Sequence, residues 1–122
     1  MPAPEQGMIV ELHGLEVFGH HGVLESEQRE GQTFLFDVTL EVAEPSADRV
    51  EETVDYRDVA ACVEEVSDSA RFNLLETLAA AVADALVASF PVATARVRVR
   101  KTRPAGLVAE WSAVTAGRSR SR

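Results

Sequence analysis

Apolar and polar residues alternate along three stretches of this chain, a period of two that is typical of β-strands with one buried face. The clearest stretch is 34–42, where residues 34, 36, 38, 40 and 42 are all apolar. The same alternation runs through residues 8–18 and 94–101, and Gly14 interrupts the first of these as a β-bulge would. A fourth strand is expected over 108–115. One apolar face on each strand predicts an antiparallel sheet.

Between the second and third strands the apolar spacing becomes helical. The stripe of the first predicted helix consists of Tyr56, Val59, Val63 and Val66. Asp55 stands just before this stripe as a candidate N-cap. A second helix is predicted from about residue 74 to 89, where Pro91 prevents its continuation. A short helical turn is also expected within the polar residues 25–32.

The resulting order, β-β-α-α-β-β, predicts an α+β fold in which both helices cover one face of a four-stranded antiparallel sheet. A chain of 122 residues fits a single core. We expect one domain over residues 8–116, a flexible N-terminus over 1–7 and a flexible basic tail over 117–122. The arginines of that tail either contact anions or stay in solvent.

Composition narrows the possible partners. The formal net charge of -8 disfavours nucleic acid, because an acidic surface repels phosphate backbones. A single cysteine, Cys62, allows no internal disulfide, which favours a reducing compartment. No segment has the length and apolarity of a membrane span or a secretory signal. The expected location is therefore the cytoplasm. Alanine and valine dominate the apolar residues, and such a thin core indicates that subunit contacts add stability.

Lys101 has an unusual position for a charged residue. It continues the apolar row of Ala95, Val97 and Val99 on the third strand. Such a lysine either extends its amine into solvent or lies in a cleft, where partial desolvation would make it a usable base near neutral pH. The spacing alone leaves both alternatives open.

Three further residues have a structural interpretation, and Glu76 allows a functional one as well. Glu76 stands three residues after Asn73 in the pattern of a capping box, which would explain it fully. If it faced a cleft instead, its carboxylate could accept two parallel N–H bonds from a guanidine-like edge. On the structural interpretation, Tyr56 is an aromatic residue of the core and Glu27 is a solvated charge on the surface.

The histidines and the cysteine give only weak indications of chemistry. His20 and His21 are adjacent, so in an extended segment they point to opposite faces and do not easily share one metal ion. His13 is distant from both. Cys62 lies on the apolar side of its predicted helix and is interpreted as core rather than as a nucleophile. No metal site is expected.

Several short segments together resemble the dihydroneopterin aldolase family. The matching segments are 19–23 (Gly-His-His-Gly-Val), 27–32, 36–38 (Phe-Asp-Val), 54–56 (Val-Asp-Tyr), 73–76 (Asn-Leu-Leu-Glu) and the strand that ends at Lys101. They occur in the order and spacing of that family and extend over most of the chain. One segment departs from it: many relatives have a proline-rich turn after the lysine, and here residues 101–106 read Lys-Thr-Arg-Pro-Ala-Gly.

The resemblance implies the T-fold, in which four-stranded units join into rings, and a homo-octamer of two stacked tetrameric rings with active sites between subunits. It implies that Lys101 is the catalytic lysine and that Glu76 binds the 2-amino and N3 edge of a pterin, with main-chain contacts from Leu75. Glu27 then corresponds to the acid near the substrate's hydroxylated side chain.

The resemblance also assigns residues to the neighbouring subunit. Tyr56 corresponds to a tyrosine that this subunit supplies for catalysis and binding, and Thr53 and Val54 would line the pterin pocket beside it. The implied reaction is retro-aldol cleavage of 7,8-dihydroneopterin, with side-chain epimerisation as a secondary activity and with no cofactor, metal or Schiff base. Three alternatives stay open: an epimerase of dihydroneopterin triphosphate, a non-catalytic pterin-binding ring protein, and a zinc enzyme of the pyruvoyl-tetrahydropterin synthase type.

Overall fold

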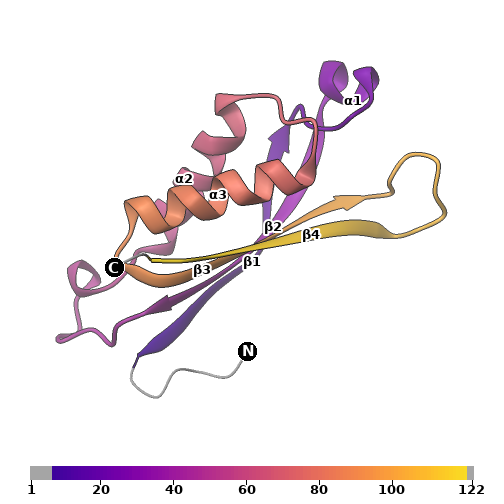
Figure 1. The fold of residues 1–122 in the computed structure, drawn as a ribbon. Helices are drawn as coiled ribbons and strands as arrows, with labels where there is room; N and C mark the ends of the chain where they lie inside the picture. The colour runs from indigo at the N-terminus through magenta and orange to yellow at the C-terminus, as the bar shows by residue number, and fades with distance from the viewer. Residues whose placement is uncertain (1–6, 121–122) are drawn as a thin grey trace.

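The structure, a computed structural model, describes residues 7–120 and has one antiparallel sheet at its centre (Figure 1). Its four strands lie in the order β1-β2-β3-β4. They are β1 (Met8–Gly19), β2 (Gln32–Val42), β3 (Val92–Thr102) and β4 (Trp111–Ser119). β2 pairs with β1 on one side and with β3 on the other, so β1 and β4 form the two edges.

Two long helices, α2 (Tyr56–Ser69) and α3 (Leu75–Ser89), cover one face of this sheet (Figure 1). A short helix, α1 (Glu25–Glu30), connects β1 to β2, and a 3-10 turn, η1 (Val50–Glu52), precedes α2. The predicted order of strands and long helices is therefore confirmed. None of the helices among the described residues is long and apolar enough to cross a membrane.

The core lies between the helices and the inner sheet face, and it follows from the alternation in the sequence. The alternating apolar residues of β2 are all buried: Phe34, Phe36, Val38, Leu40 and Val42. From β3 they meet Ala95, Val97 and Val99, and from α3 they meet Leu78, Val82 and Leu86. Full burial of one valine-, leucine- or phenylalanine-sized side chain stabilises the fold by roughly 1.5–3 kcal/mol.

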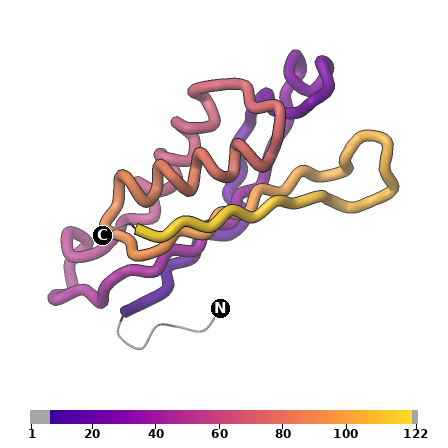
Figure 2. Tube along the Cα trace, in the orientation of Figure 1, coloured from indigo at the N-terminus to yellow at the C-terminus, as the bar shows by residue number. Residues whose placement is uncertain are grey.

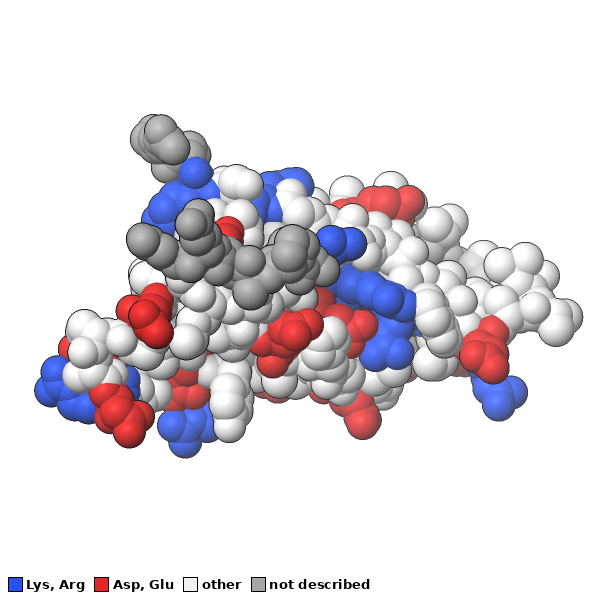
Figure 3. Space-filling model, turned by 90° about the horizontal axis from the view of Figure 1, so that it is seen from below, with Lys and Arg blue, Asp and Glu red and all other residues white. Residues whose placement is uncertain are grey.

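The outer face of the sheet carries charged side chains (Figure 3). Asp37 of β2 accepts hydrogen bonds there from Gly14 N at 2.8 Å and from Arg100 Nη2 at 3.0 Å. Burial alone would raise the pKa of Asp37, but these donors hold it below its ordinary value. Arg98 lies over the ring of Trp111, 4.5 Å from its centroid. The bulge predicted at Gly14 appears as a register shift between residues 12 and 15.

Tyr56 departs from its prediction. Its side chain is 60% exposed instead of buried, and the buried stripe of α2 begins at Val59. The physical reason is position: Tyr56 is the first residue of α2, immediately after the N-cap Asp55, and no element among residues 7–120 covers its side chain. The Asp55 carboxylate accepts a hydrogen bond from Arg57 N at 2.9 Å, so the predicted cap is confirmed.

The C-terminal boundary also differs from the prediction. β4 begins at Trp111 instead of residue 108 and continues to Ser119, so residues 117–119 are strand and not tail. Arg118 Nε lies 2.8 Å from Asp84 Oδ1 of α3, which ties the end of the strand to that helix. The end of β4 lies beside the C-terminal end of α3 (Figure 2). Arg120 donates there to the carbonyls of Val87 and Val92, at 3.0 Å each. Residues 1–6 and 121–122, which include most of the predicted flexible ends, lie outside the described residues.

Candidate active site

Lys101 lies near the end of β3, on the sheet face that the helices cover. It pairs with Phe34 of β2 and continues the row of buried valines, as the parity predicted. Its side chain is 16% exposed, so the amine lies in a cleft instead of extending into bulk solvent. The structure thus decides between the two alternatives that the spacing left open.

The amine of Lys101 donates a hydrogen bond to Glu27 Oε2 and forms an ion pair with it. Glu27 comes from α1, and its side chain is only 11% exposed. Its other carboxylate oxygen accepts from the N–H of Leu24, the N-cap of α1, at 3.2 Å. Burial alone would raise the pKa of Glu27, but the hydrogen bonds from Lys101, Leu24 and Gln32 hold it below its ordinary value. A low pKa keeps Glu27 charged beside the amine.

Gly22 leaves the space that the Glu27 carboxylate occupies. Its backbone has a φ of 141°, a conformation that residues other than glycine rarely adopt. A Cβ added at this position would lie 2.5 Å from Glu27 Oε1. The Gly-His-His-Gly segment thus ends in a residue whose small size gives Glu27 its position.

Glu76 lies in the first turn of α3 and lines the same cleft as Lys101. The predicted capping box is wrong: the N-cap of α3 is Leu74, and no side chain bonds to the cap. Asn73 instead accepts a hydrogen bond from Gln28 Nε2 at 2.6 Å. Because the Asn73 side chain bonds to Gln28 of α1 and does not cap α3, α3 begins one residue later than predicted. The Glu76 carboxylate is then not used in a cap and is available in the cleft.

The cleft has a volume of about 320 Å³ and collects residues from four parts of the chain. Its lining consists of Gly22, Val23, Leu24, Glu27, Asn73, Leu74, Leu75, Glu76, Lys101, Pro104 and Ala105. Four of the predicted site residues, Glu27, Leu75, Glu76 and Lys101, therefore meet in one cavity. The loop that departs from the family pattern closes one side of it through Pro104, which is buried, and Ala105.

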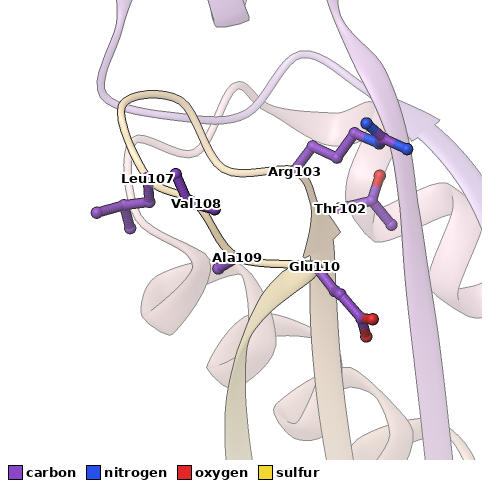
Figure 4. Close-up of a pocket in the computed structure, with 6 residues that line it drawn as sticks. All are labelled: Thr102, Arg103, Leu107, Val108, Ala109 and Glu110. Carbon is purple, nitrogen blue, oxygen red and sulfur yellow. The ribbon is translucent and has the colours of Figure 1, made fainter.

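A larger hollow of about 730 Å³ lies within the loop between β3 and β4. Figure 4 shows that the side chains around it diverge: Leu107 points away from the loop, and Arg103 and Glu110 point in different directions. Leu107 and Val108 are exposed at the tip. Since its two charged groups do not converge on a common point, we assign the chemistry to the smaller cleft.

Three predicted site residues do not line the cleft of their own chain. Tyr56 is exposed, Thr53 is partly exposed, and Val54 is buried in the hydrophobic core with 6% exposure. Thr53 and Tyr56 flank Val54 in the sequence, so the burial of Val54 holds both of them near the surface.

The side chains of the three histidines have separate environments. His21 is fully buried, His20 bonds to the carbonyl of Gln28 at 3.0 Å, and His13 contacts Glu11 at 2.9 Å on the outer face. Among residues 7–120, no three side chains of His, Cys, Asp or Glu are grouped as metal ligands. Cys62 packs against the core, as predicted, and burial raises the pKa of its thiol.

Comparison with known proteins decides the family. The model of the family described as dihydroneopterin aldolase matches residues 10–116, which include every residue of the cleft. The chain belongs to the dihydroneopterin aldolase family. A family member from Methylorubrum extorquens is 37% identical over 115 residues, covering 90% of this chain and 88% of the relative. One from Streptomyces coelicolor is 44% identical over 77 residues, covering 61% of this chain and 65% of the relative.

Solved structures of dihydroneopterin aldolases have the same fold, so the expected T-fold is confirmed. The Escherichia coli enzyme in complex with neopterin superposes with a TM-score of 0.81 at 30% identity, covering 91% of this chain and 98% of that chain. The Burkholderia thailendensis enzyme bound to guanine gives a TM-score of 0.79 at 25% identity, covering 95% and 93%. As a member of this family, the chain is an enzyme of the lyase class.

Proposed function

We propose that this chain cleaves 7,8-dihydroneopterin into 6-hydroxymethyl-7,8-dihydropterin and glycolaldehyde, as an aldehyde-lyase of folate biosynthesis. The observation that carries the proposal is the convergence of Lys101, Glu27 and Glu76 on one cleft of about 320 Å³. A cavity of this size fits a bicyclic ring with a short side chain.

Glu76 is the proposed anchor of the pterin ring. It lies at the N-terminal end of α3, where unpaired N–H groups and the helix dipole favour a negative charge. An ionised carboxylate there accepts two parallel N–H bonds from the 2-amino group and N3, with Leu75 beside it. Neopterin and guanine, the molecules bound to the two related enzymes, share this edge. Their common chemistry supports the assignment.

The residues present suit a reaction without metal or Schiff base. The substrate's C=N bond is conjugated to the carbon that is cut and accepts the electron pair of the breaking C–C bond. A base must take the proton of the 2′ hydroxyl as glycolaldehyde forms, and an acid must protonate the enamine carbon afterwards. Lys101, through a water, is the proposed acid and base, with Tyr56 of a neighbouring subunit close to it. Glu27 holds the amine and contacts the substrate's hydroxyls.

Incubation of the purified protein with 7,8-dihydroneopterin tests the proposal. We expect glycolaldehyde and 6-hydroxymethyl-7,8-dihydropterin in equal amounts, together with some epimerised substrate. Formation of the epimer without cleavage would contradict the aldolase assignment. Activity should survive chelators, and borohydride should trap no adduct on Lys101, because no imine forms. Loss of activity with a chelator would favour the zinc-enzyme alternative instead.

The position of the arginines weighs against the triphosphate epimerase. A triphosphate needs cations at the mouth of the pocket. Arg98 and Arg100 lie on the outer face of the sheet, where they contact Trp111 and Asp37, and Arg103 borders the larger hollow. None of the three lines the cleft. We therefore expect dihydroneopterin to be a better substrate than its triphosphate.

We further propose a homo-octamer of two stacked rings in the cytoplasm, built from one domain per chain. The sheet order leaves β1 and β4 as edges, and an edge strand can pair with the opposite edge of the next copy. The exposed Tyr56 and the partly exposed Thr53 are then available to a neighbour's cleft. Light scattering on the purified protein measures the subunit number, and a monomer would contradict the composite site.

A further inference from the structure

His21 is a fully buried histidine that joins two walls of the cleft but does not line it. Its Nδ1 accepts a hydrogen bond from the N–H of Phe72 at 3.0 Å. Its Nε2 lies 2.9 Å from Ser67 Oγ, near the end of α2. An Nδ1 that accepts carries no proton, so Nε2 carries the proton and donates to Ser67.

The residues next to His21 reinforce this contact. Gly22 N donates to the carbonyl of Phe72 at 2.9 Å, so both polar groups of the Phe72 main chain bond to the Gly-His-His-Gly segment. The imidazole packs against the rings of Phe34 and Phe72, with centroids 5.3 and 5.4 Å away. A Cβ added at Gly19 would lie 2.6 Å from Nε2, so the backbone encloses the ring closely.

Phe72 immediately precedes the segment that carries the proposed pterin anchor. Residues 22–24 form one wall of the cleft and residues 73–76 form another. The two hydrogen bonds at Phe72 are main-chain connections between these walls, and Gln28 adds a side-chain connection through Asn73. The position of Glu76 relative to Glu27 therefore depends on them.

We propose that His21 is a positioning residue: its unprotonated Nδ1 holds the N–H of Phe72 and so fixes the wall that carries Glu76 relative to Glu27 and Lys101. The choice of neopterin as the ligand in the second test below rests on the proposed function, whereas the hydrogen bond between His21 and Phe72 does not. Protonation of His21 would place an N–H against the N–H of Phe72 and remove the acceptor, which would loosen this wall.

The surroundings of His21 favour its neutral form. Burial lowers the pKa of His21 below 6.5, the charge of His20 lowers it further, and Asp68 of α2 opposes them. From β2 and the segment before α3 the rings of Phe34 and Phe72, which carry no charge, pack against the imidazole. A lowered folded-state pKa gives a contribution to stability that is complete above the unfolded value and lost as the pH falls through the folded value.

The first test uses the wild-type protein without ligand. Imidazole ¹⁵N shifts should show the Nε2–H tautomer at neutral pH, and hydrogen exchange should show a protected Phe72 amide. After correction for intrinsic exchange, this protection should fall at least about tenfold, the size expected for one lost buried hydrogen bond, as His21 protonates. The proposal would be overturned by an Nδ1–H tautomer, or by a hydrogen-exchange protection of the Phe72 amide that does not change when His21 is protonated.

The second test compares two variants by their affinity for neopterin between pH 5 and pH 8. His21→Asn keeps an acceptor near the position of Nδ1 but has no proton to gain, so it should bind within about threefold of wild type at neutral pH and lose the acid-dependent weakening. His21→Leu leaves the buried N–H of Phe72 unpaired and should bind roughly tenfold more weakly throughout. His13→Asn, which removes a histidine from the outer face of the sheet, is the control and should keep the wild-type pH profile.

The outcomes separate this proposal from the proposed function. If wild type fails to bind neopterin at any pH, the proposed function is wrong, and the tautomer and the exchange of Phe72 still decide the role of His21. If His21→Leu does not fold, the pH profile of His21→Asn decides it. An Asn variant that keeps the wild-type acid dependence, or a folded Leu variant with wild-type affinity, would refute the positioning role.

Discussion

Glu27 and Lys101 form an ion pair across 74 positions of sequence, at the point where α1 meets the end of β3. Both side chains are largely buried, with 11% and 16% exposure. A pair of this kind is costly to break on one side, because the remaining charge keeps its desolvation penalty without its partner. The cleft therefore depends on this contact both for its chemistry and for the position of α1.

Replacement of Lys101 by alanine should abolish turnover and largely preserve pterin binding, because the charged contact to the ring is assigned to Glu76. Loss of a general acid–base group typically costs about 10²–10⁴-fold in rate. Steady-state kinetics and the affinity for neopterin measure the two effects separately. Arg96→Ala, which removes an exposed cation from the opposite face of β3, is the control and should leave both unchanged. Equal losses in the two variants would refute the role of Lys101.

Replacement of Glu76 by alanine should weaken neopterin binding by roughly 2–3 kcal/mol, as expected when a charged hydrogen-bond partner of the ligand is removed. The unfolding free energy should change by less than about 0.5 kcal/mol, because Glu76 makes no cap in this fold. A capping residue would instead cost about 1 kcal/mol of stability and leave binding intact. Glu65→Ala, on the exposed side of α2, serves as the control.

Replacement of Gly22 by alanine should reduce activity more than stability. The new Cβ would lie 2.5 Å from Glu27 Oε1 and would push the carboxylate away from Lys101. Gly14→Ala is the matched control, because Gly14 also has positive φ, 68°, but has nothing within 4 Å of its added Cβ. Both variants should lose about 1–2 kcal/mol of stability through backbone strain. Only Gly22→Ala should lose kcat/KM, and a similar loss in both would show that strain alone is responsible.

The pH dependence of stability should reveal the pair between Glu27 and Lys101. Because the pKa of Glu27 lies below 4.5 in the folded state, its contribution is complete above that value and is lost as the pH falls through the folded pKa. Denaturant unfolding between pH 3 and pH 7 should show the stability advantage of wild type over Glu27→Gln shrinking in acid. Glu25→Gln, with a 93% exposed side chain on the same helix, should parallel wild type throughout.

Mixing two inactive variants tests whether the site is shared between subunits. If Tyr56 reaches a neighbour's cleft, some sites in a mixed oligomer of Lys101→Ala and Tyr56→Ala chains carry neither substitution. Dissociation and joint reassembly of the two variants should then restore a measurable fraction of activity, as the composite interface predicts. Separately reassembled variants are the control. Mixed oligomers without activity would contradict a site that is shared between subunits.

The sequence predicted the fold well where one element buries one face. The alternation along β2 is unambiguous because all its even-numbered residues from 34 to 42 face the helices and its odd-numbered residues face outward. The same parity predicted that Lys101 lies on the inner face. Such patterns are local, so they can be read from the sequence as an apolar period of two residues for a strand or 3.6 residues for a helix.

The contacts within the cleft were less predictable, because they depend on how distant elements pack. Glu27 looked like a surface charge, and only the folded chain brings it from α1 to Lys101 at the end of β3. The capping box at Asn73 failed because Gln28, 45 positions earlier, competes for the same side chain. Tyr56 lies on an apolar stripe, yet the described part of its own chain leaves it exposed. The two glycines around the histidines were the one local signal of a closely packed segment.

Arg120 gives the last described residues an importance that their sequence does not suggest. Its guanidinium donates to the carbonyls of Val87 and Val92, and its N–H donates to Ala93, so it closes the junction where α3 turns into β3. Purification tags are therefore better joined beyond this arginine than in place of it. A chain shortened to residue 116, where the family match ends, would expose several helix-terminal carbonyls and lose the last rungs of the sheet.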